Sequence, residues 1–399
     1  MRQGGSVQKS MFDRHRLVRL VWLGALVGGL SGSIPVLQPI SALAQTPSLE
    51  EPDRPDQLDQ LDQLDQLDQD DRIDVQWGKA WETMIQGNGK RWNLELPTLG
   101  GKQFWTDHRW WNGYRLQYNP TLEHWRLIDP GSVRKGWGTK EAMLELLQQI
   151  QEKETQGPQD KKPQELTEVF LLLHGLMRTS SSMKPVEEEL LAQIGQKERA
   201  DSFAIIRFGY ASTRSTIASH AQAFRELVEN LPGKPRVRIS GHSLGNIVTR
   251  LAIAQWTEQG DPQGILKRID RVVMMGPPNQ GSSFAKRLSY LGLFEMVTGK
   301  SGMQLGPQWD GLSSSLGIPP CPFKIIAGDL TGSTIQNPLL DGPNDAVVTV
   351  EETKLDGMTE LKTYPVLHSF LMQDPKCVAD AVEFLLREIP PKSNAAPGG

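Results

Sequence analysis

The C-terminal part of the chain alternates short apolar runs with amphipathic segments. The apolar runs, which are typical of buried strands, are EVFLLL, SFAIIRF, VRIS, RVVMMG, FKIIAG and LKTYPV. Helical patterns begin at Pro185, Ser215, Asn246 and Asp374. Regular alternation of strands and helices predicts a mostly parallel sheet covered by helices on both faces. We therefore expect an α/β domain over residues 168–390.

A different pattern precedes this domain. The segment KQFWTDHRWWNGYRLQYNPTLEHWRLID alternates aromatic and polar residues and breaks at Asn112-Gly113 and Asn119-Pro120. This pattern predicts a three-stranded meander with a tight first turn, and a helical segment, KEAMLELLQQIQEKE, follows it. We expect a small β-meander plus helix over residues 72–154, joined to the α/β domain by a polar linker at residues 155–167.

Tryptophan is concentrated in this accessory segment, because eight of the 11 tryptophans lie between residues 72 and 150. Exposed tryptophans contact sugar rings or lipid interfaces, so glycan or membrane-surface contact is one interpretation. A small sheet with few aliphatic residues also needs large side chains for its own core. We favour packing as the main role of these tryptophans.

The first 44 residues have the organisation of a signal peptide. Basic residues precede the apolar run LVWLGALVGGL, and Ala42-Leu43-Ala44 has the small-x-small pattern of a cleavage site. We expect cleavage after Ala44 and export to the periplasm or the extracellular space. The alternative is a membrane anchor at residues 20–43, although polar and glycine residues interrupt this run before it reaches the ~20 apolar residues of a spanning helix.

Charge divides the chain into an acidic leader and a balanced remainder. Residues 45–71 contain a repeated DQL triplet whose leucines drift around a helix instead of forming one face, which predicts a disordered acidic linker. The tail at residues 391–399 is expected to be disordered as well. The formal net charge is −4, and because the excess acid lies in the linker, the rest offers no basic surface for nucleic acid.

Cysteine usage excludes two further classes of protein. Only Cys321 and Cys377 are present, too few for a disulfide scaffold or a metal cluster. The two thiols of an exported protein could still pair with each other. No residue pattern indicates a metal or a cofactor.

Candidate chemistry is concentrated in the stretch RVRISGHSLGN at residues 236–246. It reads as a strand, a complete G-x-S-x-G turn and the start of a helix, which would push the Ser243 hydroxyl into the open. The amide of Leu244, at the start of the helix, is a candidate oxyanion donor. The alternative is a glycine-rich turn in which Ser243 is an ordinary N-cap.

Partners of Ser243 are expected beyond the carboxyl ends of the other strands. After the strand EVFLLL, the amide of Leu176 is a candidate second oxyanion donor, and His174 is expected to order this loop. After FKIIAG, Asp345 is the candidate acid that orients an imidazole. Asp329 and Asp341 are its rivals, either of which fits a turn or a cap equally well.

His368 follows the strand LKTYPV and is the candidate base. The chain order of Ser243, Asp345 and His368 is that of nucleophile, acid and base in α/β hydrolases. With HGLM, GHSLGN, NDAVV and LHSF in place, residues 168–390 resemble this superfamily, especially bacterial lipases and esterases.

Two further segments carry this resemblance. GPPNQGSSFA, residues 276–285, is similar to a loop of such lipases that reads PNQGS, and GHSLGNIVTR is similar to their GHSMGGIVVR helix. In that helix Arg250 fits a structural ion-pair partner, and Asn246 replaces the second glycine. The resemblance implies a serine hydrolase that acts on small-molecule or lipid carboxylic esters through an acyl-enzyme, without metal or cofactor.

An apolar, glycine-punctuated stretch at residues 286–320 leaves the substrate class open. It is either a lid over an acyl pocket or a packed core helix around Leu288, Leu291 and Phe294. A lid favours lipid or long-chain esters, whereas a core helix fits a small-ester hydrolase, an acyltransferase or a thioesterase on the same fold. A different class is a non-catalytic protein that binds glycan or lipid through its accessory segment.

Overall fold

The computed structural model describes residues 96–97, 103–155, 165–195, 202–288, 294–333, 337 and 339–388. All of them belong to one of the chain's two units, residues 70–399. The predicted signal peptide, membrane anchor, acidic linker and C-terminal tail lie outside the described residues. In the described part of the chain, no helix combines the length and apolar character that a membrane span requires.

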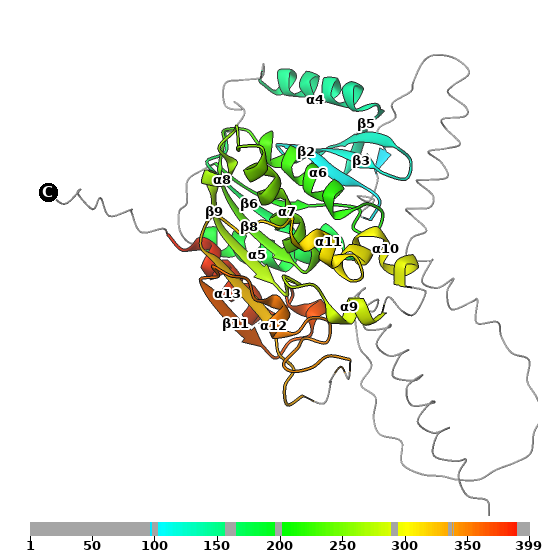
Figure 1. Ribbon diagram of the computed structural model, residues 1–399. Coiled ribbons are helices and arrows are strands. Elements are labelled where there is room, and N and C mark those ends of the chain that lie inside the picture. The colour runs from blue at the N-terminus through cyan, green and yellow to red at the C-terminus, as the bar shows by residue number, and fades with distance from the viewer. Residues whose placement is uncertain are drawn as a thin grey trace, which may run out of the picture. The chain divides into compact units, whose positions relative to one another are not determined.

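Six parallel strands form the larger of two sheets (Figure 1). They are β6 (Glu168–Leu173), β7 (Phe203–Phe208), β8 (Arg236–His242), β9 (Ile269–Met275), β10 (Phe323–Gly328) and β11 (Glu360–Tyr364). Their order in the sheet is β11-β10-β9-β8-β6-β7. The chain adds β7 on one side of β6 and β8 on the other, and such a switch opens a crevice at the carboxyl ends of the two central strands.

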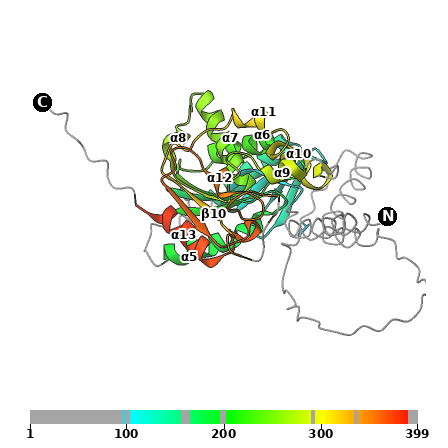
Figure 2. The same cartoon turned by 60° about the horizontal axis from the view of Figure 1, so that its bottom comes forward.

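Helices cover both faces of this sheet, as predicted (Figure 2). Helices α5 (Lys184–Gly195) and α13 (Pro375–Leu386) lie on one face, and α6 (Ile217–Glu229), α7 (Leu244–Glu258) and α8 (Ile265–Arg268) lie on the other. Strand β6 contributes to the core on each face of the sheet. Leu171 packs on the side of α6 and α7, which is called the main core below, and Leu172 packs on the side of α5 and α13. Each fully buried leucine contributes about 1.5–3 kcal/mol.

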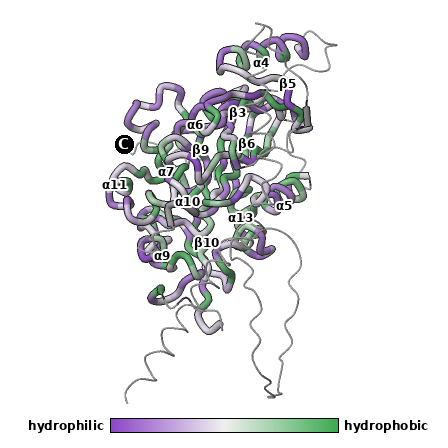
Figure 3. Tube along the Cα trace, turned by 90° about the vertical axis from the view of Figure 1, so that its right-hand side faces the viewer, coloured by the Kyte–Doolittle hydropathy of each residue, from purple (hydrophilic) through white to green (hydrophobic). Residues whose placement is uncertain are grey.

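The hydropathy of the chain follows these layers. Figure 3 shows hydrophobic residues along the strands of the parallel sheet and mainly hydrophilic residues on α4 (Lys140–Thr155). Strand β9 is buried over its whole length, which is expected of a parallel strand that is covered on both faces. This near-continuous burial explains why the apolar runs in the sequence are strong signals.

The smaller sheet, called the accessory sheet below, is antiparallel and has the order β1-β5-β4-β3-β2. Its strands are β1 (Leu96–Pro97), β2 (Thr106–Trp111), β3 (Tyr114–Asn119), β4 (His124–Ile128) and β5 (Val133–Gly138). The predicted tight turn is present, with positive φ at Asn112 and Gly113. The prediction of three strands was too few, because VRKGWG in β5 mixes charges and glycines and carries little strand pattern.

The described tryptophans of the accessory segment are all buried or half-buried. Trp111 packs with Leu116, Leu127 and Met143 into a small core between this sheet and α4, and Trp110 packs against the main core. These positions fit the packing role that we favoured. Three other tryptophans of the segment lie outside the described residues: Trp77, Trp81 and Trp92.

The accessory sheet contacts α6 through a cluster of charged side chains around Glu226. The Glu226 carboxylate lies 2.9 Å from His108 Nδ1 and 2.8 Å from Lys140 Nζ, with Arg109 at 3.4 Å. Burial alone would raise the pKa of Glu226, but the hydrogen bonds from His108 and Lys140 outweigh it and lower this pKa to about 2. The ionised carboxylate therefore stabilises the folded protein.

We predict that Glu226→Gln lowers the free energy of unfolding at pH 7 by about 1–2 kcal/mol and lowers the melting temperature accordingly. A carboxyl whose pKa is depressed on folding contributes stability above its ordinary pKa, here 4.5, and loses it as the pH falls toward about 2. The difference from wild type should therefore shrink below pH 4.5 in thermal unfolding followed from pH 7 to pH 3. Exposed Glu145→Gln is the control, and a difference that stayed constant with pH would contradict the prediction.

Candidate active site

Ser243 occupies a strained turn between β8 and α7. Its φ of 49° and ψ of −117° lie outside the regions that non-glycine residues prefer, which costs about 1–3 kcal/mol. The turn is held by a hydrogen bond from the Ser243 N–H to the Met275 carbonyl at 2.9 Å. A Cβ on Gly245 would lie 2.7 Å from the Leu173 carbonyl oxygen, so this position requires glycine.

Asn246 ties the same turn from inside the helix. Its side-chain Nδ2 donates to the Ser243 carbonyl at 3.2 Å and to the Met275 carbonyl at 3.4 Å. A Cβ on Gly241 would overlap the Asn246 side-chain oxygen, which explains the first glycine of the motif. The asparagine therefore reinforces the turn at the position where the resemblance led us to expect glycine.

Asp345 and His368 form a buried pair beyond the ends of β10 and β11. His368 Nδ1 and Asp345 Oδ2 are 2.7 Å apart, and the other carboxylate oxygen accepts the backbone N–H groups of Val347 and Val348 at 3.0 and 2.7 Å. The Asp345 side chain is 0% exposed. Its two oxygens are thus fixed by hydrogen bonds, so this carboxylate can orient the imidazole and stabilise a positive charge on it.

The rival carboxylates have other roles in the structure. Asp329 Oδ1 accepts the Thr331 N–H at 2.9 Å, which is a local turn. Asp341 is almost fully exposed and lies 3.4 Å from Arg287. In the described part of the chain, Asp345 is the acid that contacts His368.

The backbone of His368 is held by hydrogen bonds at both its N–H and its carbonyl, and the second of these comes from the residue before Ser243. Its N–H donates to the Asp345 carbonyl at 2.9 Å, and its own carbonyl accepts His242 Nε2–H at 2.9 Å. His242 was not predicted as a site residue, although its position directly before Ser243 was an available signal. Burial lowers the pKa of His242 well below its ordinary value, and the nearby His368 lowers it further, so the His242 ring stays neutral.

Gly276, at the end of β9, makes room for this arrangement. It has a φ of +54°, and a Cβ there would lie 3.0 Å from His368 Nδ1 and 2.9 Å from the Leu371 side chain. Its N–H donates to the Ile326 carbonyl at 2.8 Å. Since Met275, the residue before Gly276, accepts the N–H of Ser243, the His368 imidazole and the Ser243 turn both lie at the end of β9.

The two amides expected to bind an oxyanion both lie beside Ser243. Leu244 is the first residue of α7, and Leu176 follows Gly175, where a Cβ would lie 3.2 Å from the Cβ of Ser243. In the described part of the chain neither amide donates a hydrogen bond. Free N–H groups at a helix start and in an adjacent loop can stabilise negative charge on a bound oxygen.

His174 is buried under this loop, and its contacts do not suit a general base. Its Nδ1–H donates to the Gly175 carbonyl at 2.8 Å, and its Nε2 accepts the Tyr210 N–H at 3.4 Å. Burial lowers its pKa to about 4 in spite of these hydrogen bonds. A neutral imidazole with both nitrogens engaged orders the loop, which is the role expected from the sequence.

Arg250 differs from the expectation of an ion pair. Its guanidinium donates to the Gly317 carbonyl at 2.9 Å and to the Asn279 carbonyl and side-chain oxygen at 3.1 Å each. Within the described residues these partners are neutral oxygens, so the prediction of an ion pair is wrong. Burial accordingly lowers the pKa of Arg250 to about 10. Arg250 fixes two loops to α7 instead of balancing a charge.

The stretch predicted as a lid or core helix contains α9 (Ser283–Leu288), α10 (Phe294–Leu305) and α11 (Trp309–Ser313). Its C-terminal half is packed, because Leu305, Trp309 and Leu312 belong to the main core. Helix α10 passes next to the loop at Leu176, because a Cβ on Gly302 would lie 3.4 Å from Leu176 Cδ2. The side chains of Leu288, Leu291 and Phe294 lie outside the described residues.

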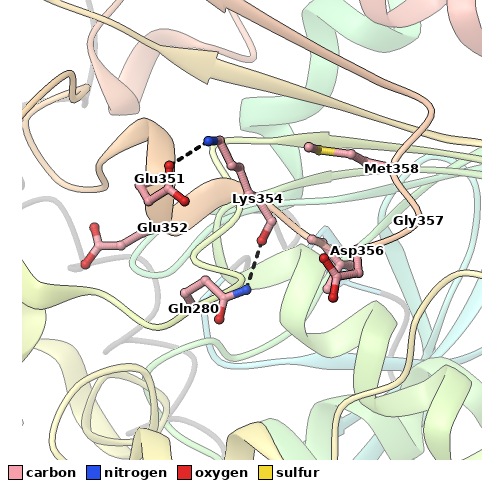
Figure 4. Close-up of a pocket in the computed structure, with 8 residues that line it drawn as sticks. Gln280, Glu351, Glu352, Lys354, Asp356, Gly357 and Met358 are labelled. Atoms are coloured by element: carbon pink, nitrogen blue, oxygen red, sulfur yellow. Dashed lines mark hydrogen bonds and ion pairs between the residues drawn. The ribbon is translucent and has the colours of Figure 1, made fainter.

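A surface pocket of about 570 Å³ lies beside α12 (Val350–Thr353) and the turn that follows it. Figure 4 shows that Lys354 pairs with Glu351 at the edge of this pocket and that Gln280 donates to the Lys354 carbonyl. The residues of the Ser243 turn and the Asp345–His368 pair do not line it. The pocket is therefore separate from the candidate active site.

Within the described residues no cluster of metal-binding side chains is present. Cys321 and Cys377 are free thiols, so the structure does not pair them. Burial raises the pKa of both. Thiols kept in their neutral form by burial are poor nucleophiles, which leaves Ser243 as the nucleophile candidate at this edge of the sheet.

The strand order, the helices on both faces and the serine turn after β8 define an α/β-hydrolase fold. The predicted fold class is thus confirmed. A family model described as "Domain of unknown function (DUF7379)" matches residues 141–318. The comparison with curated proteins found no match.

Several solved structures match part of this chain. Phospholipase PlaB from Legionella pneumophila matches with a TM-score of 0.42 and 15% identity, over 55% of this chain and 60% of that chain. The mature lipase BlEst2 of Bacillus licheniformis matches with a TM-score of 0.38 and 18% identity, over 54% and 89%. The metagenomic carboxyl esterase MGS0156 matches with a TM-score of 0.38 and 15% identity, over 58% and 74%. The names phospholipase, lipase and esterase describe the matched proteins and not this chain.

We predict that Gly276→Ala destabilises the protein more than Gly260→Ala. Both glycines have a positive φ, so either change costs about 1–2 kcal/mol of backbone strain. A Cβ at Gly260 meets open space, whereas one at Gly276 contacts His368 and Leu371 at about 3 Å. The melting temperatures of the two variants measure the difference. Equal decreases in melting temperature would contradict the prediction, because they would show that an alanine at position 276 does not disturb His368.

Proposed function

We propose that this protein is a serine hydrolase of carboxylic esters, with Ser243 as nucleophile, His368 as general base and Asp345 as the acid that orients the imidazole. The observation that carries the proposal is the 2.7 Å contact between His368 Nδ1 and Asp345 Oδ2 against a strained serine turn. Imidazole held by a buried carboxylate, beside a serine and free amides, is the constellation that acyl transfer requires.

The first half of the reaction forms an acyl-enzyme. Nε2 of His368 takes the proton of the Ser243 hydroxyl as the oxygen attacks the ester carbonyl, and the carbonyl π electrons move onto the oxygen. The N–H groups of Leu176 and Leu244 stabilise this oxyanion. When the tetrahedral intermediate collapses, the C–O bond to the alcohol breaks, and the imidazolium gives its proton to the leaving oxygen.

The second half releases the acid. His368 takes a proton from a water molecule, which attacks the acyl carbon and forms a second oxyanion at the same amides. Collapse breaks the bond to Ser243, and the imidazolium returns the proton to the serine oxygen. The Asp345 carboxylate stays ionised throughout and stabilises the imidazolium in both halves.

The substrate in this proposal is a small-molecule or lipid ester, bound without metal or cofactor. The packing of Leu305, Trp309 and Leu312 into the core argues that the C-terminal half of the predicted lid is fixed, which favours short acyl chains over long ones. Export after cleavage behind Ala44 is part of the proposal and rests on the sequence pattern of residues 1–44. The half-buried or buried tryptophans of the accessory sheet give no support to glycan or membrane contact.

We expect the protein to hydrolyse p-nitrophenyl esters, tested from butyrate to palmitate, with the highest kcat/KM on the short chains. Ser243→Ala should abolish turnover, and Asp345→Asn should lower kcat by about 10³–10⁴-fold, because the imidazole loses its orienting carboxylate. Asp329→Asn is the matched control, since that side chain can still cap its turn, and its kcat should equal that of wild type. Equal losses at Asp329 and Asp345, or turnover that survives Ser243→Ala, would contradict this assignment.

A further inference from the structure

The loop at residues 209–216, between β7 and α6, is held by the first residues of β2 in the accessory sheet. The Gly209 N–H donates to Asp107 Oδ2 at 2.7 Å, and the Asp107 N–H donates to the Gly209 carbonyl at 2.9 Å. Two residues further on, the Ala211 N–H donates to Thr106 Oγ1 at 3.1 Å. These three hydrogen bonds all use backbone groups of the loop or the strand, so they fix the path of the loop itself.

The other side of this loop holds the candidate oxyanion loop. The Ser212 Oγ accepts the Met177 N–H at 3.1 Å. The Tyr210 hydroxyl donates to the His174 carbonyl, and the two rings stack with their centroids 4.0 Å apart. Leu176 lies between His174 and Met177 in the chain, so residues on both sides of its amide are tied to the 209–216 loop.

Asp107 is itself held by a buried polar network. Gln117 Nε2 donates to Asp107 Oδ1 at 2.7 Å, and Arg126 Nε donates to Gln117 Oε1 at 2.8 Å. Arg115 lies 3.6 Å from Asp107 Oδ2. Asp107 and Arg126 are both 0% exposed. Buried charges of this kind are costly unless fully paired, and this network directs one acceptor oxygen out of the accessory sheet and onto Gly209.

The second contact of the accessory sheet with the α/β domain serves as a contrast. His108, the next residue in β2, contacts Glu226 on α6. Glu226 lies near the C-terminal end of α6, whereas the 209–216 loop precedes its N-terminal end. Adjacent side chains on β2 therefore contact two different places. Asp107 contacts the loop that holds the candidate oxyanion loop, and His108 contacts the far end of α6.

We propose that Asp107 is a positioning residue of the active site: through Gly209 and Ser212 it holds the backbone at Leu176 where the N–H can bind the oxyanion. The accessory sheet is then a working part of the hydrolase and not a separate binding module. This inference rests on the proposed function, because it concerns the oxyanion donor of that same site.

Active-site titration separates positioning from simple loss of folded protein. The full chain is titrated with a fluorophosphonate to count reactive sites, and kcat is expressed per titrated site. Asp107→Ala should lower this kcat by about 10–100-fold with KM changed less than about threefold, because a misplaced oxyanion donor acts on the transition state. Asp107→Asn, which keeps an acceptor oxygen for Gly209, should recover most of the loss.

Two further variants keep the test decisive. Ser212→Ala cuts the contact to Met177 from within the α/β domain, leaves the accessory sheet intact and should give the same fall in kcat per site. His108→Ala, which removes the contact to Glu226, should leave kcat per site at the wild-type value. If Asp107→Ala and Ser212→Ala lower only the number of titrated sites, or if His108→Ala shows the same defect, the positioning role is overturned.

Amide hydrogen exchange distinguishes failure of this inference from failure of the proposed function. Asp107→Ala should speed exchange in peptides that cover residues 173–178 and 209–213, whereas His108→Ala should not. A wild-type protein that neither hydrolyses esters nor reacts with the fluorophosphonate, yet shows this coupling, would overturn the hydrolase and with it a catalytic role for the coupling. Unchanged exchange in both segments would overturn the coupling itself.

Discussion

The positive φ of Ser243 is the constraint on which the rest of the candidate site depends. A serine does not adopt φ 49° and ψ −117° without strain on the order of 1–3 kcal/mol, so other contacts must impose this conformation. The Met275 carbonyl and the Asn246 side chain hold the turn, and the glycines of the motif admit the neighbouring backbone. The register of β8 against β9 therefore determines where the serine hydroxyl points.

Each remaining part of the site is positioned against this turn. His242 holds the carbonyl of His368, and Gly276 leaves space for the imidazole. Gly175 lets the candidate oxyanion loop lie close to Ser243, and this loop is in turn tied to Tyr210 and Ser212. The accessory sheet is connected to the same contacts through the hydrogen bond between Asp107 and Gly209, which joins residues 102 positions apart in the chain.

The sequence was informative where the physical cause is local. Strands that are buried on both faces leave apolar runs, and strained turns demand glycine, so the order of elements from Glu168 onward and the turn at Ser243 could be predicted. Strand β5 was missed because its charges and glycines hide the alternation. The roles of Asp107 and His242 were missed because their partners, Gly209 and His368, are 102 and 126 residues away, and no local pattern records such a contact.

Chemical labelling of the serine is the most direct test of the central claim. The protein would be treated with a fluorophosphonate and digested with trypsin, and the adduct would be located by tandem mass spectrometry. Our account predicts one stoichiometric adduct, in the peptide spanning residues 239–250 and on Ser243 instead of Ser240. No adduct, or an adduct on another residue, would contradict the assignment of Ser243 as the nucleophile.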